Sequence, residues 1–237
     1  MNQIDSLKDI IKIYKSIQKY QNKLDDLSAN LLLQELLRFQ EYFPVTDSSL
    51  RFHTLAVILN DIILNKRQNC IEFGSGISTL VIANLLKRNK LPYKLFSVED
   101  NIEWYNYMNS FVVTNDLTQH VVLMYAPLEK TELATGNNSW YSTKILDEKI
   151  NTDLKFNLVI VDGPGAWKPE IQLSRYTAVP YLINKLAENF SIYLDDSNRK
   201  GEKKIIDLWQ KKYKLKFSQI NDTTSVSTKG NNLNTIL

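Results

Sequence analysis

The stretch "CIEFGSGISTL", residues 70–80, places an apolar run directly before two closely spaced glycines, and it decides the fold. The apolar run predicts a buried strand, Gly74 and Gly76 predict a tight turn, and the residues from 77 to 88 predict a helix. Glycines at such a turn let the backbone approach a ligand closely, at the carboxyl edge where open α/β sheets bind. The stretch therefore predicts a strand–turn–helix unit that holds a ligand.

Short apolar runs alternate with helical patterns from residue 69 onward. The predicted strands are "NCIEF" (69–73), "KLFSV" (94–98), "HVVLMY" (120–125), "NLVIV" (157–161) and "SIYLD" (191–195). The predicted helices lie near 77–88, 101–112, 170–185 and 200–212. Such alternation indicates a parallel sheet with helices on both faces. The runs "LKFSQI" and "TSVSTKG", separated by the turn-like "NDT", predict a final hairpin at one edge of the sheet.

Residues 1–45 are predicted to be a helical appendage to an α/β domain that covers residues 46–237. Apolar spacing predicts a helix over 4–24 and a second helix in "LSANLLLQELLRF". "YFPVTDSS" then interrupts the pattern, and Ser48 or Ser49 is expected to cap a third helix that runs to about Leu64. The appendage has apolar residues on more than one side, which favours packing against the core or a second copy. A lid over the acceptor site and a homodimer contact both remain open.

Composition describes an ordinary globular protein, with 43% hydrophobic and 23% charged residues. The net charge of +3, from 29 basic and 26 acidic residues, is not that of a dedicated nucleic-acid binder. A single cysteine, Cys70, excludes a disulfide framework. No apolar run approaches the roughly 18 residues of a membrane span, and the first residues lack a signal-peptide core. We therefore expect a cytoplasmic protein without a membrane span or a nucleic-acid partner.

The residues around the glycine turn narrow the choice of ligand. A dinucleotide fingerprint requires a third glycine where Thr79 stands, and no Gly-Lys-Ser/Thr of a P-loop is present. Glu72 precedes the turn, where it would repel a pyrophosphate and attract a cation. Glu99 ends the next predicted strand, where an acid accepts hydrogen bonds from ribose hydroxyls. These residues predict an adenosine that carries a positive charge, which is S-adenosylmethionine.

The chain resembles the class I methyltransferase family, in "EFGSGIST" and "VEDN". It is most similar to a bacterial subgroup of small methyltransferase-domain proteins, which occur among surface-polysaccharide and natural-product genes. The subgroup's pattern continues in "APL" (126–128), "WY" (140–141), "VDGP" (161–164), "RYTAVP" (175–180) and "LDDSNRKGE" (194–202). The resemblance covers residues 50–228. It implies a Rossmann-like, seven-stranded, mostly parallel sheet with an antiparallel C-terminal hairpin. It also implies these cofactor-binding residues: Glu72, Gly74, Ser75, Gly76, Ser78, Thr79, Glu99, Asp100, Ala126, Pro127, Leu128 and Asp162.

Three carboxylates follow the last two parallel strands. Asp162 ends the fourth strand, and Asp195 and Asp196 end the fifth, so all three are expected at the edge that holds the glycine turn. Convergent oxygen ligands suit Mg²⁺ or a similar cation, which would clamp an acceptor hydroxyl and lower its pKa. Metal-dependent O-methyltransferases of the catechol type resemble this chain at these strand ends, although they have Asp-Asn where this chain has Asp195-Asp196. Without a metal, Asp162 or Asp196 is the candidate general base.

The remaining candidates each have a structural alternative. Lys168 would orient the acceptor or act as a base, or be solvated. Arg175 and Arg199 would form ion pairs or contact an anionic acceptor, and Arg199 is a possible partner of Asp195 or Asp196. Trp140 and Tyr141 would cover the cofactor or line the acceptor site, or pack beneath their loop.

The predicted function is S-adenosylmethionine-dependent O-methylation of a small-molecule, sugar or nucleotide-sugar hydroxyl, in surface-polysaccharide or natural-product biosynthesis. An NAD(P)-linked oxidoreductase is the first alternative, disfavoured by Thr79 and by the lack of a paired Tyr/Lys or His catalytic set. The second alternative is a non-catalytic Rossmann-like interaction protein.

Overall fold

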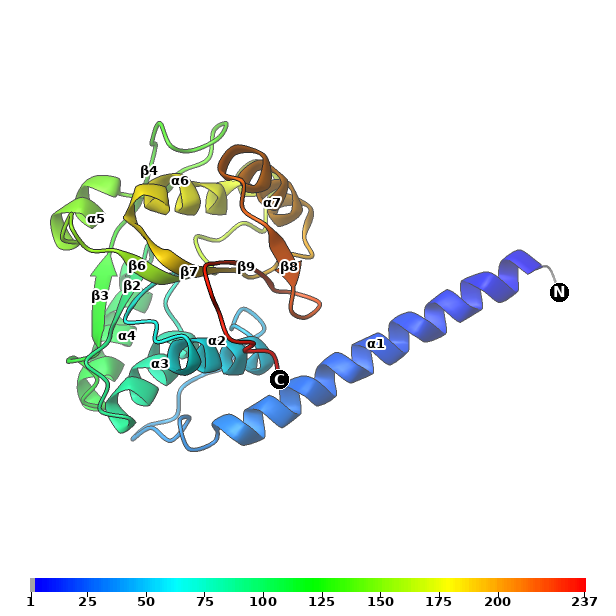
Figure 1. The fold of residues 1–237 in the computed structure, drawn as a ribbon, viewed down its shortest axis with the longest axis horizontal. Coiled ribbons are helices and arrows are strands. Elements are labelled where there is room, and N and C mark those ends of the chain that lie inside the picture. Colours follow the sequence, from blue (N-terminus) through cyan, green and yellow to red (C-terminus); the bar gives the residue numbers. More distant parts are fainter. Residues whose placement is uncertain (1–2) are drawn as a thin grey trace.

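The computed structural model describes residues 3–237, with side chains from residue 7 onward. A seven-stranded sheet with the order β3-β2-β1-β6-β7-β9-β8 forms its centre (Figure 1). The five strands from β3 to β7 in that order are parallel, and β9 and β8 add an antiparallel pair at the edge. The predicted fold class and the predicted terminal hairpin are confirmed.

The element bounds follow the sequence pattern closely in the α/β part. The sheet consists of β1 (Asn69–Phe73), β2 (Lys94–Glu99), β3 (Val121–Tyr125), β6 (Phe156–Val161), β7 (Leu186–Leu194), β8 (Phe217–Gln219) and β9 (Ser225–Lys229). A separate antiparallel pair is formed by β4 (Leu128–Glu129) and β5 (Trp140–Tyr141). The α-helices are α1 (Gln3–Leu33), α2 (Phe52–Leu64), α3 (Ile77–Arg88), α4 (Ile102–Thr114), α5 (Thr143–Lys149), α6 (Ala178–Leu182) and α7 (Lys200–Tyr213).

Successive residues of the central strands point to opposite faces of the sheet, so two apolar cores form. Cys70 of β1 belongs to the core under α2, α3 and α4. Its neighbour Ile71 belongs to the core under α5, α6 and α7. Both side chains are completely buried, because helices cover the sheet on both sides (Figure 1). Cys70 is a free thiol, as expected.

The N-terminal segment differs from the prediction. Instead of two helices, one continuous helix, α1, runs to Leu33, since no proline or glycine interrupts it. Only its C-terminal end packs on the body, through buried Ala29 and Leu33 and a hydrogen bond from the His53 amide to Asp26. The rest of α1 extends away from the body (Figure 1). Residues 1 and 2 of the predicted appendage lie outside the described part.

Two further predictions were wrong in detail. Neither Ser48 nor Ser49 caps α2, which begins at Phe52 after Arg51 without a side-chain cap. The predicted helix over 170–185 is a series of short pieces: η1 (Pro169–Ile171), η2 (Ser174–Thr177), α6 and η3 (Ile183–Lys185). Pro180 lies in the first turn of α6, where it has no amide hydrogen to donate to the residues before it, which fits an α-helix that begins only at Ala178. Among the described residues, no helix is long and apolar enough to cross a membrane.

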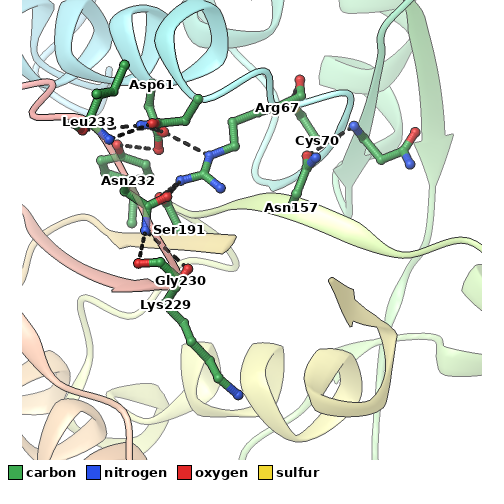
Figure 2. A network of polar contacts seen from close by, with 12 residues as sticks. Asp61, Arg67, Cys70, Asn157, Ser191, Lys229, Gly230, Asn232 and Leu233 are labelled. Carbon is green, nitrogen blue, oxygen red and sulfur yellow. Dashed lines mark hydrogen bonds and ion pairs between the residues drawn. The ribbon is translucent and has the colours of Figure 1, made fainter. Parts of the chain in front are cut away.

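A buried polar network ties the start of β1 to β7 and the C-terminal segment (Figure 2). Arg67 donates to Asp61 at 2.8 Å and to Ser191 at 2.8 Å, and it also donates to Asn232. Tyr193 donates to the second oxygen of Asp61 at 2.9 Å. The side chains of Arg67 and Asp61 are each only 1% exposed. This network lies at the amino end of β1 and stabilises the fold away from the glycine turn.

Candidate functional site

The glycine turn after β1 packs against the turn after β6. Gly74 has a φ of +94°, and a Cβ there would lie 3.0 Å from the amide nitrogen of Gly163. A Cβ on Gly163 would lie 2.3 Å from the hydroxyl oxygen of Tyr141. Both positions therefore require glycine, Gly74 for its left-handed backbone and Gly163 for space. The close approach brings Asp162, which follows β6, next to the turn.

Glu72 lies beneath the turn and is completely buried. Its carboxylate accepts hydrogen bonds from the hydroxyls of Ser78, Thr79 (2.5 Å) and Ser97 (2.9 Å). Burial raises the pKa of Glu72 to about 7, although these three hydrogen bonds oppose the shift. Glu72 thus fixes the start of α3 to the neighbouring strand β2, and its side chain does not line the cavity at the turn.

Glu99, at the end of β2, joins the same turn from the other side. One carboxylate oxygen accepts from the Ser75 hydroxyl at 2.8 Å and from the Ser75 amide at 3.2 Å. The other accepts from the amides of Asp100 (3.0 Å) and Asn101 (2.9 Å). Burial and the nearby Glu99 raise the pKa of Asp100 to about 6. Glu99 is therefore held rigidly at the expected edge of the sheet.

A cavity of about 280 Å³ opens over the glycine turn. Gly76 lines it, and a Cβ built on Gly76 would meet no atom within 4 Å. Since Gly76 has an extended φ of −179°, neither strain nor packing within the protein requires glycine there. The free space beside Gly76 is what a ligand that contacts the backbone needs. The other lining residues are Phe43, Pro44, Thr46, Ser48, Ser49, Leu50, Gly74, Ser75, Ile77, Ser78, Trp104 and Asp162.

A second cavity of about 270 Å³ lies beside the first. Asp162 and Ser48 line both cavities, so the two adjoin at these side chains. The other residues that line the second cavity are Asp47, Gly165, Ala166, Trp167, Arg175, Asp195, Asp196 and Arg199. The arrangement provides two adjacent compartments with a carboxylate at their boundary.

Burial is the main cause that raises the pKa of Asp162 well above its usual range, and the charge of Asp195 is the second. The charge of Arg175 lowers this pKa. The carboxyl of Asp195 also has a raised pKa, with burial as the main cause and Asp196 as the second. Asp162 is therefore a carboxyl group that holds its proton more tightly than an exposed aspartate does. A carboxyl group with a raised pKa is a stronger base than an exposed carboxylate and suits proton transfer.

Arg175 connects the carboxylates and is itself only 5% exposed. Its guanidinium donates to Asp196 at 3.0 Å and to the Asp162 carboxylate at 3.4 Å. It also donates to three backbone oxygens, those of Asp162, Pro164 and Asp195. Of the two alternatives for each arginine, the structure shows the ion pair, with Arg199 contacting Asp196 at 2.8 Å. Contact with an anionic acceptor stays a prediction for both.

The predicted metal ligands converge, because oxygens of Asp162, Asp195 and Asp196 lie within 4.8 Å of one another. Each of them already has a protein partner, however. Arg175 bridges Asp162 and Asp196, and Asp195 accepts from the Thr224 hydroxyl at 2.8 Å. These contacts use one oxygen of each carboxylate, and a divalent cation on the other oxygens would lie beside a buried, permanently charged guanidinium that repels it. In this arrangement the donor set does not fit a metal ion.

Other predicted site residues lie away from the two cavities. Trp140 and Tyr141 form β5 and are completely buried, packed against Phe73 in the core. The alternative that they pack beneath their loop is the one that this placement supports, and they do not line the acceptor cavity. Lys168 is exposed and lines neither cavity.

The "APL" segment follows β3. Ala126 is completely buried and Leu128 is exposed at the start of β4, while Pro127 accepts a backbone hydrogen bond from Ser142. None of the three lines the cavity over the glycine turn.

Sequence reasoning missed the wall that covers the glycine turn. Six residues of the segment 43–50 line the first cavity together with Trp104, whose indole nitrogen donates to the Ser75 backbone oxygen at 2.9 Å. They are Phe43, Pro44, Thr46, Ser48, Ser49 and Leu50. The sequence signal was the polar run "TDSS" after a proline, which was interpreted as a helix cap. A run of short polar side chains next to the predicted start of the sheet domain is equally typical of a ligand-facing loop.

Solved methyltransferase structures share this architecture. A methyltransferase of Podospora anserina, bound to S-adenosylhomocysteine, superposes with a TM-score of 0.60 at 13% identity, over 93% of this chain and 96% of the other. An O-methyltransferase of Streptomyces achromogenes, involved in tomaymycin synthesis and bound to S-adenosylmethionine, superposes with a TM-score of 0.56 at 11% identity. The match covers 91% of this chain and 96% of the other. An O-methyltransferase of Bacillus cereus, bound to S-adenosylhomocysteine, superposes with a TM-score of 0.56 at 10% identity. The match covers 91% of this chain and 97% of the other.

No model of a known protein family matches the sequence, and no curated protein matches it either. The likeness at 10–13% identity shows the fold. The chain therefore has the Rossmann-like fold of these methyltransferases. The bacterial subgroup expected from the motifs stays a prediction.

Proposed function

We propose that this protein is an S-adenosylmethionine-dependent methyltransferase that methylates a hydroxyl group of a small molecule, a sugar or a nucleotide sugar. The observation that carries the proposal is the pair of adjoining cavities with Asp162 at their boundary. One cavity faces the glycine turn and the other faces a cluster of polar side chains. Transfer of a group between two ligands requires such neighbouring compartments, since the two reacting atoms have to meet.

The cofactor is assigned to the cavity over the glycine turn. Gly76 leaves space for close backbone contact, and Ser75 and Ser78 line the same wall. Glu99 lies behind Ser75 and does not itself line the cavity; it would reach the ribose hydroxyls by exchanging the hydrogen bond that it now accepts from the Ser75 hydroxyl. Glu72 supports this wall from below. The three neighbours were solved with S-adenosylmethionine or S-adenosylhomocysteine bound, which supports the choice of cofactor.

The proposed chemistry needs a proton acceptor beside the acceptor hydroxyl. When bound, S-adenosylmethionine supplies a methyl group on a positively charged sulfur, which a nucleophilic oxygen can displace. Asp162 would take the proton from the acceptor hydroxyl, because it lines both cavities and burial raises its pKa above that of an exposed aspartate. Asp196 lies on the acceptor side and, held by Arg175 and Arg199, would orient the acceptor.

The acceptor cavity limits the size of the group that is methylated. About 270 Å³ is at the lower end of the range for ligand pockets, which suits a group the size of a single sugar ring. Arg199 is 45% exposed at its rim and would contact an anionic part of the acceptor. The predicted Mg²⁺ is not part of this proposal, because Arg175 bridges the carboxylates expected to hold it. A role in surface-polysaccharide or natural-product biosynthesis, in the cytoplasm, completes the proposal.

Calorimetric titration with S-adenosylhomocysteine tests the cofactor site directly. We expect micromolar binding to the wild-type chain and an affinity at least about tenfold lower for Gly76→Val, because the new side chain fills the cavity wall. Ala187→Val, a similar enlargement at the far end of β7, is the matched control and should bind as the wild type does. Unfolding curves of both variants establish that the fold is intact.

NAD⁺ under the same conditions separates the alternatives. Binding of NAD⁺ without binding of S-adenosylhomocysteine would support the oxidoreductase and contradict our proposal. Binding of neither ligand to a well-folded chain would support a non-catalytic interaction protein.

A further inference from the structure

Arg175 occupies the centre of the acidic cluster in the acceptor cavity. Its three guanidinium nitrogens make five hydrogen bonds, two to carboxylates and three to backbone oxygens at the ends of β6 and β7 and in the loop after β6. A guanidinium cannot lose its charge in a protein, so a full positive charge stays among Asp162, Asp195 and Asp196. The backbone contacts lock this charge in place.

A fourth carboxylate stands behind the guanidinium. An oxygen of Glu202, at the start of α7, lies 3.9 Å from Arg175, and the Glu202 side chain is 1% exposed. Neither oxygen of Glu202 has a hydrogen-bond partner among the described residues. The only cation within ion-pair distance of it in the described part is Arg175, so the buried charges of this region depend on the guanidinium.

We propose that Arg175 is the fixed cation of this site, and that it takes the place that a divalent metal ion would otherwise have between the carboxylates. This proposal rests on the proposed function and deepens it: Arg175 is a positioning residue that holds Asp162 and Asp196 in the acceptor cavity. A divalent ion requires several oxygen ligands at 2.0–2.6 Å, and on these carboxylates it would add two positive charges next to a guanidinium that cannot lose its own.

The experiment uses Mn²⁺ alone as the probe, measured by electron paramagnetic resonance and calorimetry on the full chain. We expect no stoichiometric Mn²⁺ binding to the wild type at submillimolar concentrations. Arg175→Met should gain one Mn²⁺ site that binds at least about tenfold more tightly than the wild type does. The double variant with Arg175→Met and Asp195→Asn should lose this site. Arg175→Lys keeps the charge and should not gain the site. Arg199→Met removes only the exposed partner of Asp196 and is the matched control.

Two results would overturn the proposal. One is a single Mn²⁺ bound by the wild type and lost in Asp195→Asn, which remains measurable even if Arg175→Met fails to fold. The other is a folded Arg175→Met variant without a Mn²⁺ site. S-adenosylhomocysteine binding, measured in EDTA on the same samples, keeps this question separate: its absence contradicts the proposed function, not the role of Arg175.

A different observation concerns the exposed face of α1. Seven large apolar residues follow one another at alternating spacings of three and four along this helix. They are Ile10, Ile13, Ile17, Tyr20, Leu24, Leu27 and Leu31, and each is 58–68% exposed. Sustained spacing of this kind over three heptads is the pattern of a coiled coil. We call this set the α1 seam.

The α1 seam is free for a partner because the body docks elsewhere on the helix. Asp26, Ala29 and Leu33 contact the body, and they lie on the face opposite Leu24, Leu27 and Leu31 at 100° per residue. The whole seam therefore stays exposed along the extended helix (Figure 1).

Charge along α1 indicates how a second copy would lie. Five lysines and one acid, Asp9, fall between residues 8 and 23. Asp25 and Asp26 follow in the next turn, and Asp26 lies on the face that contacts the body. A parallel pair would place the two lysine-rich halves side by side, and an antiparallel pair would place each beside the acidic end of the other. We propose that a second copy of this chain covers the α1 seam in an antiparallel coiled coil, with the two methyltransferase bodies at opposite ends.

Sedimentation of the full chain tests this second proposal. We expect twice the chain mass of 27.5 kDa for the wild type and a monomer for Ile17→Glu with Leu24→Glu. Ile11→Glu alters an exposed apolar residue of the same helix outside the seam and should remain a dimer. Spin labels on Asp9→Cys should lie about 30–40 Å apart in the antiparallel dimer and about 10 Å apart in a parallel one. A monomeric wild type, the short label distance, or a monomer that sediments with anionic vesicles would each overturn the proposal.

Discussion

Glu72→Gln should remove a pH dependence of stability that the buried Glu72 carboxyl beneath the glycine turn imposes on the protein. Glu72 is completely buried, and burial raises its pKa from 4.5 to about 7. The folded state therefore binds this proton more tightly than the unfolded state. Between about pH 4.5 and pH 7 the folded chain holds more protons, so the free energy of unfolding decreases as the pH rises through this range.

The size of the effect follows from the shift. About 2.5 pH units at 1.36 kcal/mol each gives about 3 kcal/mol, fully expressed above pH 7 and absent below about pH 4.5. Glutamine does not ionise, and it still offers an acceptor to the hydroxyls of Thr79 and Ser97. The stability of the wild type relative to Glu72→Gln should therefore fall by about 3 kcal/mol between pH 4.5 and pH 8.

Urea unfolding at a series of pH values measures this difference, because other titrating groups contribute equally to both chains. Glu148→Gln, which removes an exposed carboxylate of α5, is the control and should show no such change. A difference between the wild type and Glu72→Gln that stays constant with pH would refute the reasoning. It would mean that the three hydroxyls stabilise the Glu72 carboxylate enough to cancel its burial.

Three further changes test the packing around the site and the fold. Gly74→Ala should lower the free energy of unfolding in urea by about 1–3 kcal/mol, because alanine is strained at a φ of +94° and its Cβ crowds Gly163 in the turn after β6. Arg67→Met should cost about 3–5 kcal/mol by leaving Asp61 buried and unpaired, whereas Arg88→Met, at an exposed pair, should cost less than about 1 kcal/mol. Tyr141→Phe should be neutral or stabilising by up to about 1 kcal/mol in thermal unfolding, because the buried hydroxyl has no partner among the described residues; a clear loss of stability would contradict that assignment.

The sheet was predictable because each strand carries its own signal. "NCIEF" and "NLVIV" are short runs without the length or spacing of a helix, and both are central strands in the structure. The edge hairpin was predictable from its turn residues, and the Asn221 side chain does accept from the amides of Thr223 and Thr224. Local patterns suffice where local chemistry decides the conformation.

The site was less predictable, because side-chain pairing across the fold decides it. The sequence placed Asp162, Asp195 and Asp196 at one edge correctly, yet it could not show that Arg175, from a segment expected to be helical, would bridge them. The same holds for Trp140: the sequence left open whether it covers the cofactor, lines the acceptor site or packs beneath its loop, and the structure buries it in the core. Both outcomes depend on contacts between residues far apart in the chain.

The predicted domain boundary at residue 45 is another feature that contacts between distant residues decide. Helix α1 extends away from the body, as a separate appendage would, but the segment that follows it forms part of the wall of the cavity over the glycine turn. Phe43 packs on Trp104 and Phe111 of α4, with ring centroids 5.9 Å and 5.1 Å apart, and lines the cavity over the glycine turn. Because the aromatic anchor lies before residue 45 and Ser48 lies after it, a boundary at that point separates residues that line one cavity. The wall of the cavity over the glycine turn therefore begins within the predicted appendage.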